Sequence, residues 1–306
     1  MPKPMKFQQL PVEQLDAAAK HPDTIMQQKV DGIRAVLKIT NRAGQSRTIQ
    51  MMAGNGNQMK STTAKPTADR ILAWAETTFG TSHDYDLTLD GEIIDGTWWV
   101  FDMPRSPRST ERTGYARRLA LLTGLLSRLP RDERLIRVLP AASTVTAKQA
   151  LVAAVRANGG EGVIVKHREG SYDWDGRVAH SLKAKFTHTV DCVVLARNIG
   201  PQGKLNAVLG VYQKVNGSGP LGGIPIGPTT EITGEAVEIG NCSMIGKPDA
   251  QPGDVVEVKY LYAGAGGRLV QPTLLRIRDD KPAEDCSLEQ LRFVNKAVLD
   301  GTHVPF

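Results

Sequence analysis

The stretch Lys-Val-Asp-Gly-Ile-Arg at residues 29–34 decides the fold prediction, because it joins two strand-like runs. The runs are residues 24–30 (TIMQQKV) and 33–39 (IRAVLKI), and Gly32 supplies the bend between them. On an extended chain Lys29 and Asp31 share a face. Such a bend can present an amine to a phosphorus centre. The plainer interpretation is a surface hairpin with charged tips.

Five further segments combine strand-like or turn-forming residues with charged side chains. They are DGE at 90–92, WWVFD at 98–102, EGVIVK at 161–166, KAK at 183–185 and RIRDDK at 276–281. Each segment is a weak signal alone, because aromatic runs usually belong to a core and lysines usually face solvent. Their order and spacing along the chain carry the interpretation.

Taken together, the segments resemble the covalent nucleotidyltransferase superfamily of ATP-dependent DNA ligases, RNA ligases and mRNA capping enzymes. Its collinear motifs KxDGxR, DGE, an aromatic strand, EGxxxK, KxK and RxDK are matched in order between residues 29 and 281. The chain is most similar to the compact two-domain DNA ligases of bacteriophages. The resemblance implies an α+β fold, with an N-terminal nucleotidyltransferase (adenylation) domain of antiparallel sheets flanked by helices at residues 1–187. A C-terminal OB-fold β-barrel domain is expected at residues 188–306.

Local patterns agree with this division of the chain. Apolar periodicity predicts helices at residues 12–20, 67–79, 111–129 and 146–158. Strands are expected at 47–52, 85–94, 136–139 and 181–186 in addition to the two runs around Gly32. Beyond residue 187, short strand-like runs alternate with Gly- and Pro-rich loops, which is typical of a small β-barrel. These runs are residues 190–197, 207–213, 236–239, 255–260 and 273–278.

The basic surplus of the chain lies in its first part. Among 306 residues, 38 lysines and arginines face 32 acids, a net charge of +6. Residues 1–187 carry 27 basic and 19 acidic side chains, whereas residues 188–306 carry 11 and 13. A polyanionic partner such as nucleic acid or a nucleotide fits this distribution, and an indifferent basic surface would produce it too.

The resemblance implies a covalent first step at Lys29. This amine would attack the α-phosphorus of ATP, release pyrophosphate and keep AMP covalently bound. A lysine ammonium must first lose a proton, and neighbouring cations such as Lys183 and Lys185 favour that loss. The same two lysines are expected at the α-phosphate. By resemblance, three residues of the last motif close over ATP and orient the pyrophosphate: Arg278, Asp280 and Lys281.

The remaining nucleotide contacts are also implied by resemblance. Arg34 and Glu92 would hold the ribose, and Phe101 would stack on adenine. Gln27, two residues before the lysine, is expected to border the base. Glu92 and Glu161 are the candidate ligands of Mg²⁺, which prefers oxygen ligands, and Mn²⁺ is an expected substitute.

Nicked duplex DNA is the expected partner besides ATP. DNA ligases commonly carry an arginine after the first hairpin that touches the nick phosphate, but residues 53–57 read AGNGN here. Lys60 and Arg47 are the candidate replacements. The arginine-rich stretch from residue 105 to residue 118 either contacts DNA phosphates or forms a solvated helix face. Its candidate DNA-binding residues are Arg105, Arg108 and Arg112.

The function expected from the sequence is an ATP-dependent DNA ligase. It would seal nicks between a 5′-phosphate and a 3′-hydroxyl in duplex DNA, through lysyl-AMP and then DNA-adenylate. An RNA ligase or an mRNA guanylyltransferase is the alternative within the superfamily, and a non-catalytic nucleic-acid-binding module is the alternative outside it. We expect a cytoplasmic monomer without a membrane partner. Three widely spaced cysteines (Cys192, Cys242 and Cys286) argue against a disulfide framework.

Overall fold

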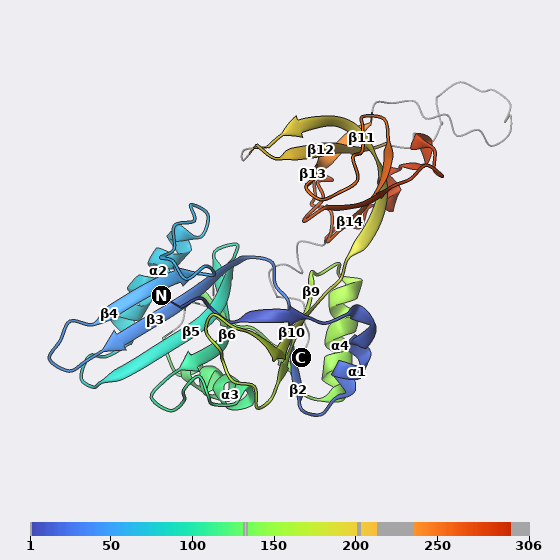
Figure 1. The fold of residues 1–306 in the computed structure, drawn as a ribbon. Helices are drawn as coiled ribbons and strands as arrows, with labels where there is room; N and C mark the ends of the chain where they lie inside the picture. The colour runs from blue at the N-terminus through green and yellow to red at the C-terminus, as the bar shows by residue number, and fades with distance from the viewer. Residues whose placement is uncertain (1, 131, 133, 201–202, 213–235, 295–306) are drawn as a thin grey trace, which may run out of the picture. The chain divides into compact units, whose positions relative to one another are not determined.

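A computed structural model describes residues 2–130, 132, 134–200, 203–212 and 236–294, which form a mixed α+β structure as the sequence predicts (Figure 1). The chain divides into two compact units between Lys185 and Phe186. The boundary expected from the sequence falls after residue 187. The Gly- and Pro-rich loop at residues 216–228 lies outside the described residues, as do the other residues of 213–235 and the last residues of the chain, 295–306.

Two five-stranded sheets build the first unit. The first sheet has the order β1-β10-β9-β2-β8. Its strands are β1 (Lys6–Gln9), β2 (Thr24–Gln28), β8 (Ala141–Ala142), β9 (Gly162–His167) and β10 (Arg177–Lys185). The second sheet has the order β4-β3-β5-β6-β7. Its strands are β3 (Ile33–Asn41), β4 (Thr48–Ala53), β5 (Tyr85–Ile94), β6 (Thr97–Arg105) and β7 (Ile136–Val138).

The prediction of antiparallel sheets needs one correction. The pairs β1–β10 and β6–β7 are parallel, and each places a short parallel strand at the edge of a sheet. Both edge strands come from distant parts of the chain rather than from a hairpin, so no tight turn imposes an antiparallel direction on them. All other strand pairs of the first unit are antiparallel.

The helices of the first unit lie against these sheets (Figure 1). They are η1 (Val12–Gln14), α1 (Leu15–Lys20), α2 (Lys65–Thr78), α3 (Tyr115–Leu126) and α4 (Val145–Ala157). Ile71 of α2 and Leu122 of α3 join the core around Leu37 of the second sheet. Helix α4 contacts β2 and β9 of the first sheet, and α1 contacts α4. Helix α3 is shorter than predicted, because Gly114 before it has extended dihedral angles (φ −57°, ψ 146°).

The decisive motif forms the connection between the two sheets. Strand β2 ends at Gln28 and β3 begins at Ile33, so Lys29 follows its strand instead of lying within it, and the expected strand over residues 24–30 is two residues too long. A Cβ on Gly32 would lie 2.4 Å from the backbone oxygen of Ile93. Only glycine lets the chain pass so close to β5. The motif therefore places Lys29 at the junction of the two sheets.

The second unit is built around one antiparallel sheet with the order β13-β12-β11-β14-β15. Its elements are β11 (His188–Ile199), β12 (Leu205–Val211), β13 (Val237–Ser243), β14 (Val255–Tyr260), β15 (Thr273–Ile277), η2 (Ala283–Asp285) and η3 (Leu288–Gln290). The outer strands β13 and β15 also contact each other. All three cysteines are buried in this unit with free thiols. No helix among the described residues combines the length and apolarity that a membrane crossing requires.

Candidate active site

A cavity of about 230 Å³ in the first unit gathers residues from most of the predicted motifs. Its charged and polar lining comprises Lys6, Gln27, Gln28, Lys29, Arg34, Glu92, Lys166, Arg177 and Lys183. Its apolar lining comprises Phe7, Val30, Phe101, Leu139 and Ile164. These residues come from both sheets and from the connection between them. The structure thus places six predicted site residues around one space: Gln27, Lys29, Arg34, Glu92, Phe101 and Lys183.

Lys29 is held by the buried carboxylate of Glu161. The Lys29 backbone N–H donates to the Gly162 oxygen at 2.8 Å, and the Lys29 ammonium contacts Glu161 Oε2. The Lys185 ammonium lies 3.0 Å from the other carboxylate oxygen, Oε1. Gly162 makes this approach possible, because a Cβ there would meet the Ala184 oxygen at 2.0 Å. One carboxylate, 2% exposed, therefore bridges two lysines.

Arg34 is fixed by a second buried carboxylate. Asp90 Oδ1 accepts from Arg34 Nε at 3.0 Å, and Oδ2 accepts from Nη2 at 2.6 Å. The Tyr172 hydroxyl donates to Asp90 Oδ2 at 2.7 Å, and Arg34 Nη1 donates to the Met5 oxygen at 2.7 Å. Burial opposes the charged form of Arg34, but its acidic neighbours, Asp90 foremost, together outweigh burial and raise the pKa of the guanidinium. The bidentate geometry holds Arg34 at the cavity in one orientation.

Among the described residues, Glu92 is the one carboxylate that lines the cavity directly. It faces Arg34 across the β3–β5 pairing, and its Oε1 accepts from the Gly32 backbone N–H at 3.1 Å. Burial raises the pKa of Glu92 to about 7, although the charges of Lys29 and Arg34 act in the opposite direction. The Glu92 carboxyl is therefore poised between its protonated and ionised forms near neutral pH.

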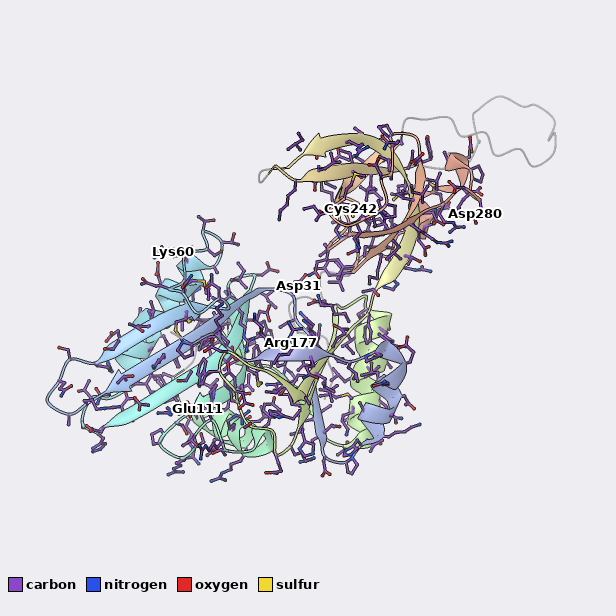
Figure 2. All side chains as sticks on the ribbon, viewed as in Figure 1. Asp31, Lys60, Glu111, Arg177, Cys242 and Asp280 are labelled. Atoms are coloured by element: carbon purple, nitrogen blue, oxygen red, sulfur yellow. The ribbon has the colours of Figure 1, made fainter. Side chains whose placement is uncertain are left out.

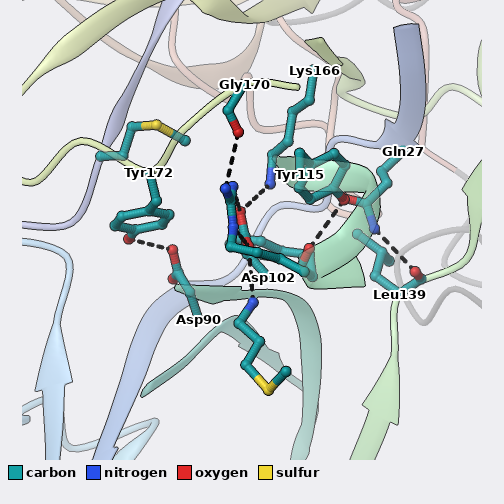
Figure 3. Close-up of polar contacts among 12 residues, drawn as sticks. Gln27, Asp90, Asp102, Tyr115, Leu139, Lys166, Gly170 and Tyr172 are labelled. Atoms are coloured by element: carbon teal, nitrogen blue, oxygen red, sulfur yellow. Dashed lines mark hydrogen bonds and ion pairs between the residues drawn. The ribbon is translucent and has the colours of Figure 1, made fainter. Parts of the chain in front are cut away.

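A third buried carboxylate, Asp102, holds Lys166 of the cavity lining (Figure 3). It accepts from Arg118 Nε at 2.8 Å and from Lys166 Nζ at 3.0 Å. Burial raises the pKa of Asp102, but Lys166 and Arg118 overcome this effect and lower it to about 2. Lys166 Nζ also lies 4.1 Å from the ring centroid of Tyr115, so this lysine reaches the cavity in a fixed position.

The amide of Gln27 is oriented by the same network. The Tyr115 hydroxyl donates to Gln27 Oε1 at 2.7 Å, and Gln27 Nε2 donates to the Leu139 oxygen at 3.0 Å (Figure 3). Tyr115 and Gln27 are both buried. The side-chain amide at the cavity wall therefore presents its remaining donor and acceptor sites in a defined direction.

Lys183 lines the cavity beside these held groups. It alternates along β10 with the buried Ala184, so Lys183 and Lys185 share a face of the strand as the sequence predicts. Burial, followed by the charges of Lys185 and Lys29, lowers the pKa of the Lys183 ammonium. The loss of a proton is thereby made easier at this position.

The carboxylates of the cavity suit Mg²⁺ only in partnership with a substrate. No group of three or more His, Cys, Asp and Glu side chains gathers for a metal within the described parts of the chain. Glu92 supplies an oxygen donor in the cavity lining and Glu161 one beside it, and the negative charge of Glu161 is one of the causes that raise the pKa of Glu92. Mg²⁺ is commonly held by one or two carboxylates together with substrate phosphates and water. The donor set therefore fits a magnesium ion that arrives with a nucleotide.

The last motif lies in the second unit, around Asp191. Arg278 Nη1 is 3.1 Å from Asp191 Oδ1, and Lys281 Nζ is 2.6 Å from Oδ2. Arg278 Nε also donates to Asp280 Oδ1 at 2.7 Å, and this guanidinium lowers the pKa of the exposed Asp280 (labelled in Figure 2) to about 2. Sequence reasoning missed Asp191, because a single acid within the apolar run of β11 gives no signal.

The candidate DNA-binding residues differ in how exposed they are. Lys60, labelled in Figure 2, is exposed in the connection after β4, and Arg108 and Arg112 are exposed as well. Arg105 is half-buried and pairs with Glu111 at 2.9 Å. These positions leave the predicted DNA contacts of Lys60, Arg108 and Arg112 sterically open.

Two other arginines that the sequence analysis places near DNA are held by carboxylates of the protein. Arg47 packs on α2, where it contacts the Glu76 carboxylate and the Phe79 oxygen, so it is unsuited to replace the nick-phosphate arginine. Arg118 is fully buried against Asp102 instead of belonging to a charged surface stretch. Helical spacing could have revealed this position, because Arg118 falls on the face of Tyr115 and Leu122.

Several cavity residues were not predicted at all. Lys6 and Phe7 lie on β1, whose sequence KFQQ shows no strand pattern, and Arg177 begins β10 outside any motif. Lys166 ends a recognised motif but received no role. Its buried position over Phe101 and Tyr115 depends on Asp102, which only the folded structure brings near.

Two mixed sheets around a charged cavity, followed by an antiparallel sheet unit, make up a fold that solved DNA ligase structures share. A mycobacterial DNA ligase D complexed with ATP and MES is 19% identical, over 93% of this chain and 97% of the ligase, with a TM-score of 0.50. A Lig E DNA ligase is 18% identical over 91% of this chain and all of that one (100%), with a TM-score of 0.55. The structure called Pmar-Lig_Pre is 18% identical over 91% and 68%, with a TM-score of 0.59.

The likeness establishes a mixed α+β fold similar to that of ligase adenylation domains. No protein-family model matches the sequence, and no curated protein matches it either. The shared fold and the cavity residues, rather than overall sequence similarity, are therefore the grounds on which a function is assigned.

Proposed function

We propose that the protein is an ATP-dependent DNA ligase that seals nicks in duplex DNA. The observation that carries this proposal is the position of Lys29. Its amine meets the Glu161 carboxylate at a cavity whose lining comes from the other nucleotidyltransferase motifs, within a fold shared with DNA ligases. A surface hairpin with charged tips would not bring these groups together.

The first step of the proposed reaction is attack on ATP by Lys29. After losing a proton, the amine uses its lone pair to form a bond to the α-phosphorus. The bond from that phosphorus to the bridging oxygen breaks, and its electron pair leaves with pyrophosphate. The second proton of the attacking nitrogen is lost afterwards, which leaves a phosphoramide to AMP. Glu161 positions the amine, and Lys183 and Lys185 neutralise the α-phosphate.

The proposed nucleotide contacts follow the lining of the cavity. Phe101 stacks on adenine and Gln27 borders it, while Arg34 and Glu92 hold the ribose. Glu92 and Glu161 would hold Mg²⁺, for which Mn²⁺ substitutes. The metal would supply neutralisation of phosphate charge.

We assign the remaining steps to both proposed domains. The adenylation domain corresponds to residues 1–187 and the OB-fold domain to residues 188–306, where Arg278, Asp280 and Lys281 orient the pyrophosphate. AMP then passes from Lys29 to the 5′-phosphate of the nick. The 3′-hydroxyl attacks this DNA-adenylate, the phosphodiester forms and AMP leaves. Exposed DNA contacts are proposed at Lys60, Arg108 and Arg112, with a weaker one at the ion-paired Arg105.

The test combines nucleotide labelling with a substrate panel. Wild-type protein, Lys29→Ala and the exposed-lysine control Lys3→Ala are each incubated with Mg²⁺ and labelled ATP or GTP, and then separated under denaturing conditions. We expect label from ATP on the wild type and the control, and none on Lys29→Ala. Labelling by GTP would favour a guanylyltransferase. Sealing of nicked RNA in preference to nicked DNA would favour an RNA ligase, and no labelling at all would favour a binding module.

A further inference from the structure

Phe7 lines the cavity and has no role in the function proposed above. It lies on β1, and its side chain is half-buried. Phe7 pairs with Val178 of β10, whereas the next residue of β1 pairs with Leu182, so the register of the two strands shifts at this point. Irregularities of this kind re-aim side chains and are common beside functional sites. An aromatic ring with uncovered surface thus borders the space that the nucleotide would occupy.

The ring of Phe7 stands close to two cations of the cavity lining. Its centroid lies 5.6 Å from the guanidinium carbon of Arg34 and 5.8 Å from Lys166 Nζ. The ring of Phe101 stands in the same relation, at 5.7 Å from Arg34 and 5.2 Å from Lys166. Buried carboxylates hold both cations, so the two rings are placed around one fixed pair of charges.

The two rings reach the cavity from different sheets. Phe7 belongs to the first sheet, and Phe101 lies on β6 of the second. Across the described part of the chain, no ring–ring contact joins them. Both line the cavity, so each leaves ring surface to the cavity instead of to the other ring.

The surroundings of Phe7 match the nucleoside end of a nucleotide. The reacting amine of Lys29 is held at Glu161, and the proposed function places the ribose at Arg34 and adenine on Phe101. A ring that lies beside Arg34 and around the same cations as Phe101 therefore faces the nucleoside. Aromatic side chains suit this position, because stacking against a base buries area on both partners.

We propose that Phe7 is a second aromatic contact, besides Phe101, for the nucleoside of the bound nucleotide. This inference rests on the proposed function and adds a residue of β1 to its binding site. Adenosine, AMP and ATP share the contact, because all three carry the nucleoside. The contact does not depend on the phosphates.

Equilibrium binding of adenosine and AMP tests the contact without forming the adduct, because neither ligand carries a pyrophosphate to release. Protein is first treated with pyrophosphate and Mg²⁺ to remove AMP already bound. We expect Phe7→Ala to bind both ligands roughly tenfold more weakly, and Phe7→Tyr to stay within about twofold of the wild type. The control Phe79→Ala removes a half-buried ring outside the cavity and should bind both ligands as the wild type does.

Phe7→Trp places a fluorescent reporter at the proposed contact. We expect AMP to quench the emission of the introduced tryptophan, after subtraction of the signal from the wild type, which has four tryptophans of its own. Phe79→Trp is the matched control and should show no quenching beyond that of the wild type.

Three outcomes would overturn the inference while leaving the proposed function in place. The first is wild-type affinity for adenosine in Phe7→Ala. The second is a loss of affinity in Phe7→Ala without quenching in Phe7→Trp, since the ring would then act only by packing on Arg34. The third is a loss for AMP that adenosine does not share, which would assign the ring to the phosphate. Failure of the wild type to bind either ligand would instead contradict the proposed function itself, and the inference with it.

Discussion

Three buried carboxylates, Asp90, Asp102 and Glu161, hold three cations of the cavity lining in place: Arg34, Lys166 and Lys29. Each is 0–2% exposed, and each accepts from at least one cation that lines the cavity. Removing one partner from a buried pair leaves an uncompensated charge, which is costly. The chemistry of the site therefore depends on residues that need not touch substrate.

Glu161→Gln tests the positioning of Lys29. The amide keeps the size of the side chain but cannot hold two lysine ammonium groups, so the nucleophile loses its fixed place. We expect the rate of AMP-adduct formation to fall by roughly 10²-fold, in quench-flow assays with labelled ATP. Glu169→Gln, at an exposed carboxylate, is the control and should leave the rate unchanged. A wild-type rate in Glu161→Gln would contradict the proposed role of Glu161 in positioning Lys29.

Tyr172→Phe tests the support of Arg34. The change removes the hydroxyl that donates to Asp90 at 2.7 Å. The Asp90 carboxylate is then positioned by its bidentate hydrogen bonds with Arg34. We expect KM for ATP in adduct formation to rise several-fold, with a loss of about 1 kcal/mol in unfolding free energy. Tyr85→Phe removes a hydroxyl that bonds an exposed loop oxygen and is the matched control. A stability loss with an unchanged KM would reduce Tyr172 to a purely structural role.

At the scale of elements, the sequence predicts the helices and strands that have strong apolar periodicity. It misses strands that form only through pairing with another strand. Strand β5 (Tyr85–Ile94) and strand β14 (Val255–Tyr260) occupy their predicted ranges, and all four predicted helices of the first unit exist. Strand β1 was missed because its single apolar residue, Phe7, gives no pattern, and it exists through pairing with β10. The predicted motif residues of the first unit meet at or beside the cavity, whereas the pairing of Lys166 with Asp102 depends on packing between the two sheets.

Gly32→Ala tests the connection between β2 and β3. The added Cβ would meet the Ile93 oxygen at 2.4 Å and Ile94 Cγ1 at 2.5 Å, so the backbone must move. We expect a loss of roughly 2 kcal/mol in the urea-unfolding free energy, together with slower adduct formation. Gly80→Ala is the control glycine, since a Cβ there meets nothing within 4 Å. Equal stabilities of the two variants would contradict the proposed constraint at Gly32.

At the scale of the whole molecule, we expect the first unit to lose stability in acid because Asp102 becomes protonated. Its pKa in the folded state is about 2, below the value of about 3.9 for an unfolded chain. Because the folded pKa is lowered, the stabilisation is present above pH 4 and is lost as the pH falls toward 2. The contribution is on the order of 2 kcal/mol.

Unfolding measured between pH 4 and pH 2 checks this expectation. Asp102→Asn should be less stable at pH 7 by roughly 3 kcal/mol, because Lys166 and Arg118 lose their buried partner, and its stability should fall less steeply with acid. The control Asp69→Asn removes an exposed carboxylate on α2 and should keep the wild-type slope. A wild-type slope in Asp102→Asn would contradict the assignment to Asp102.

The central claim is that Lys29 becomes covalently linked to AMP, and peptide mapping by mass spectrometry tests it most directly. Protein is first treated with pyrophosphate and Mg²⁺ to remove any AMP already bound, and it is then given fresh ATP and digested. The account predicts one adenylyl group, on the peptide that contains Lys29. Absence of the adduct, or an adduct on another lysine, would contradict the account.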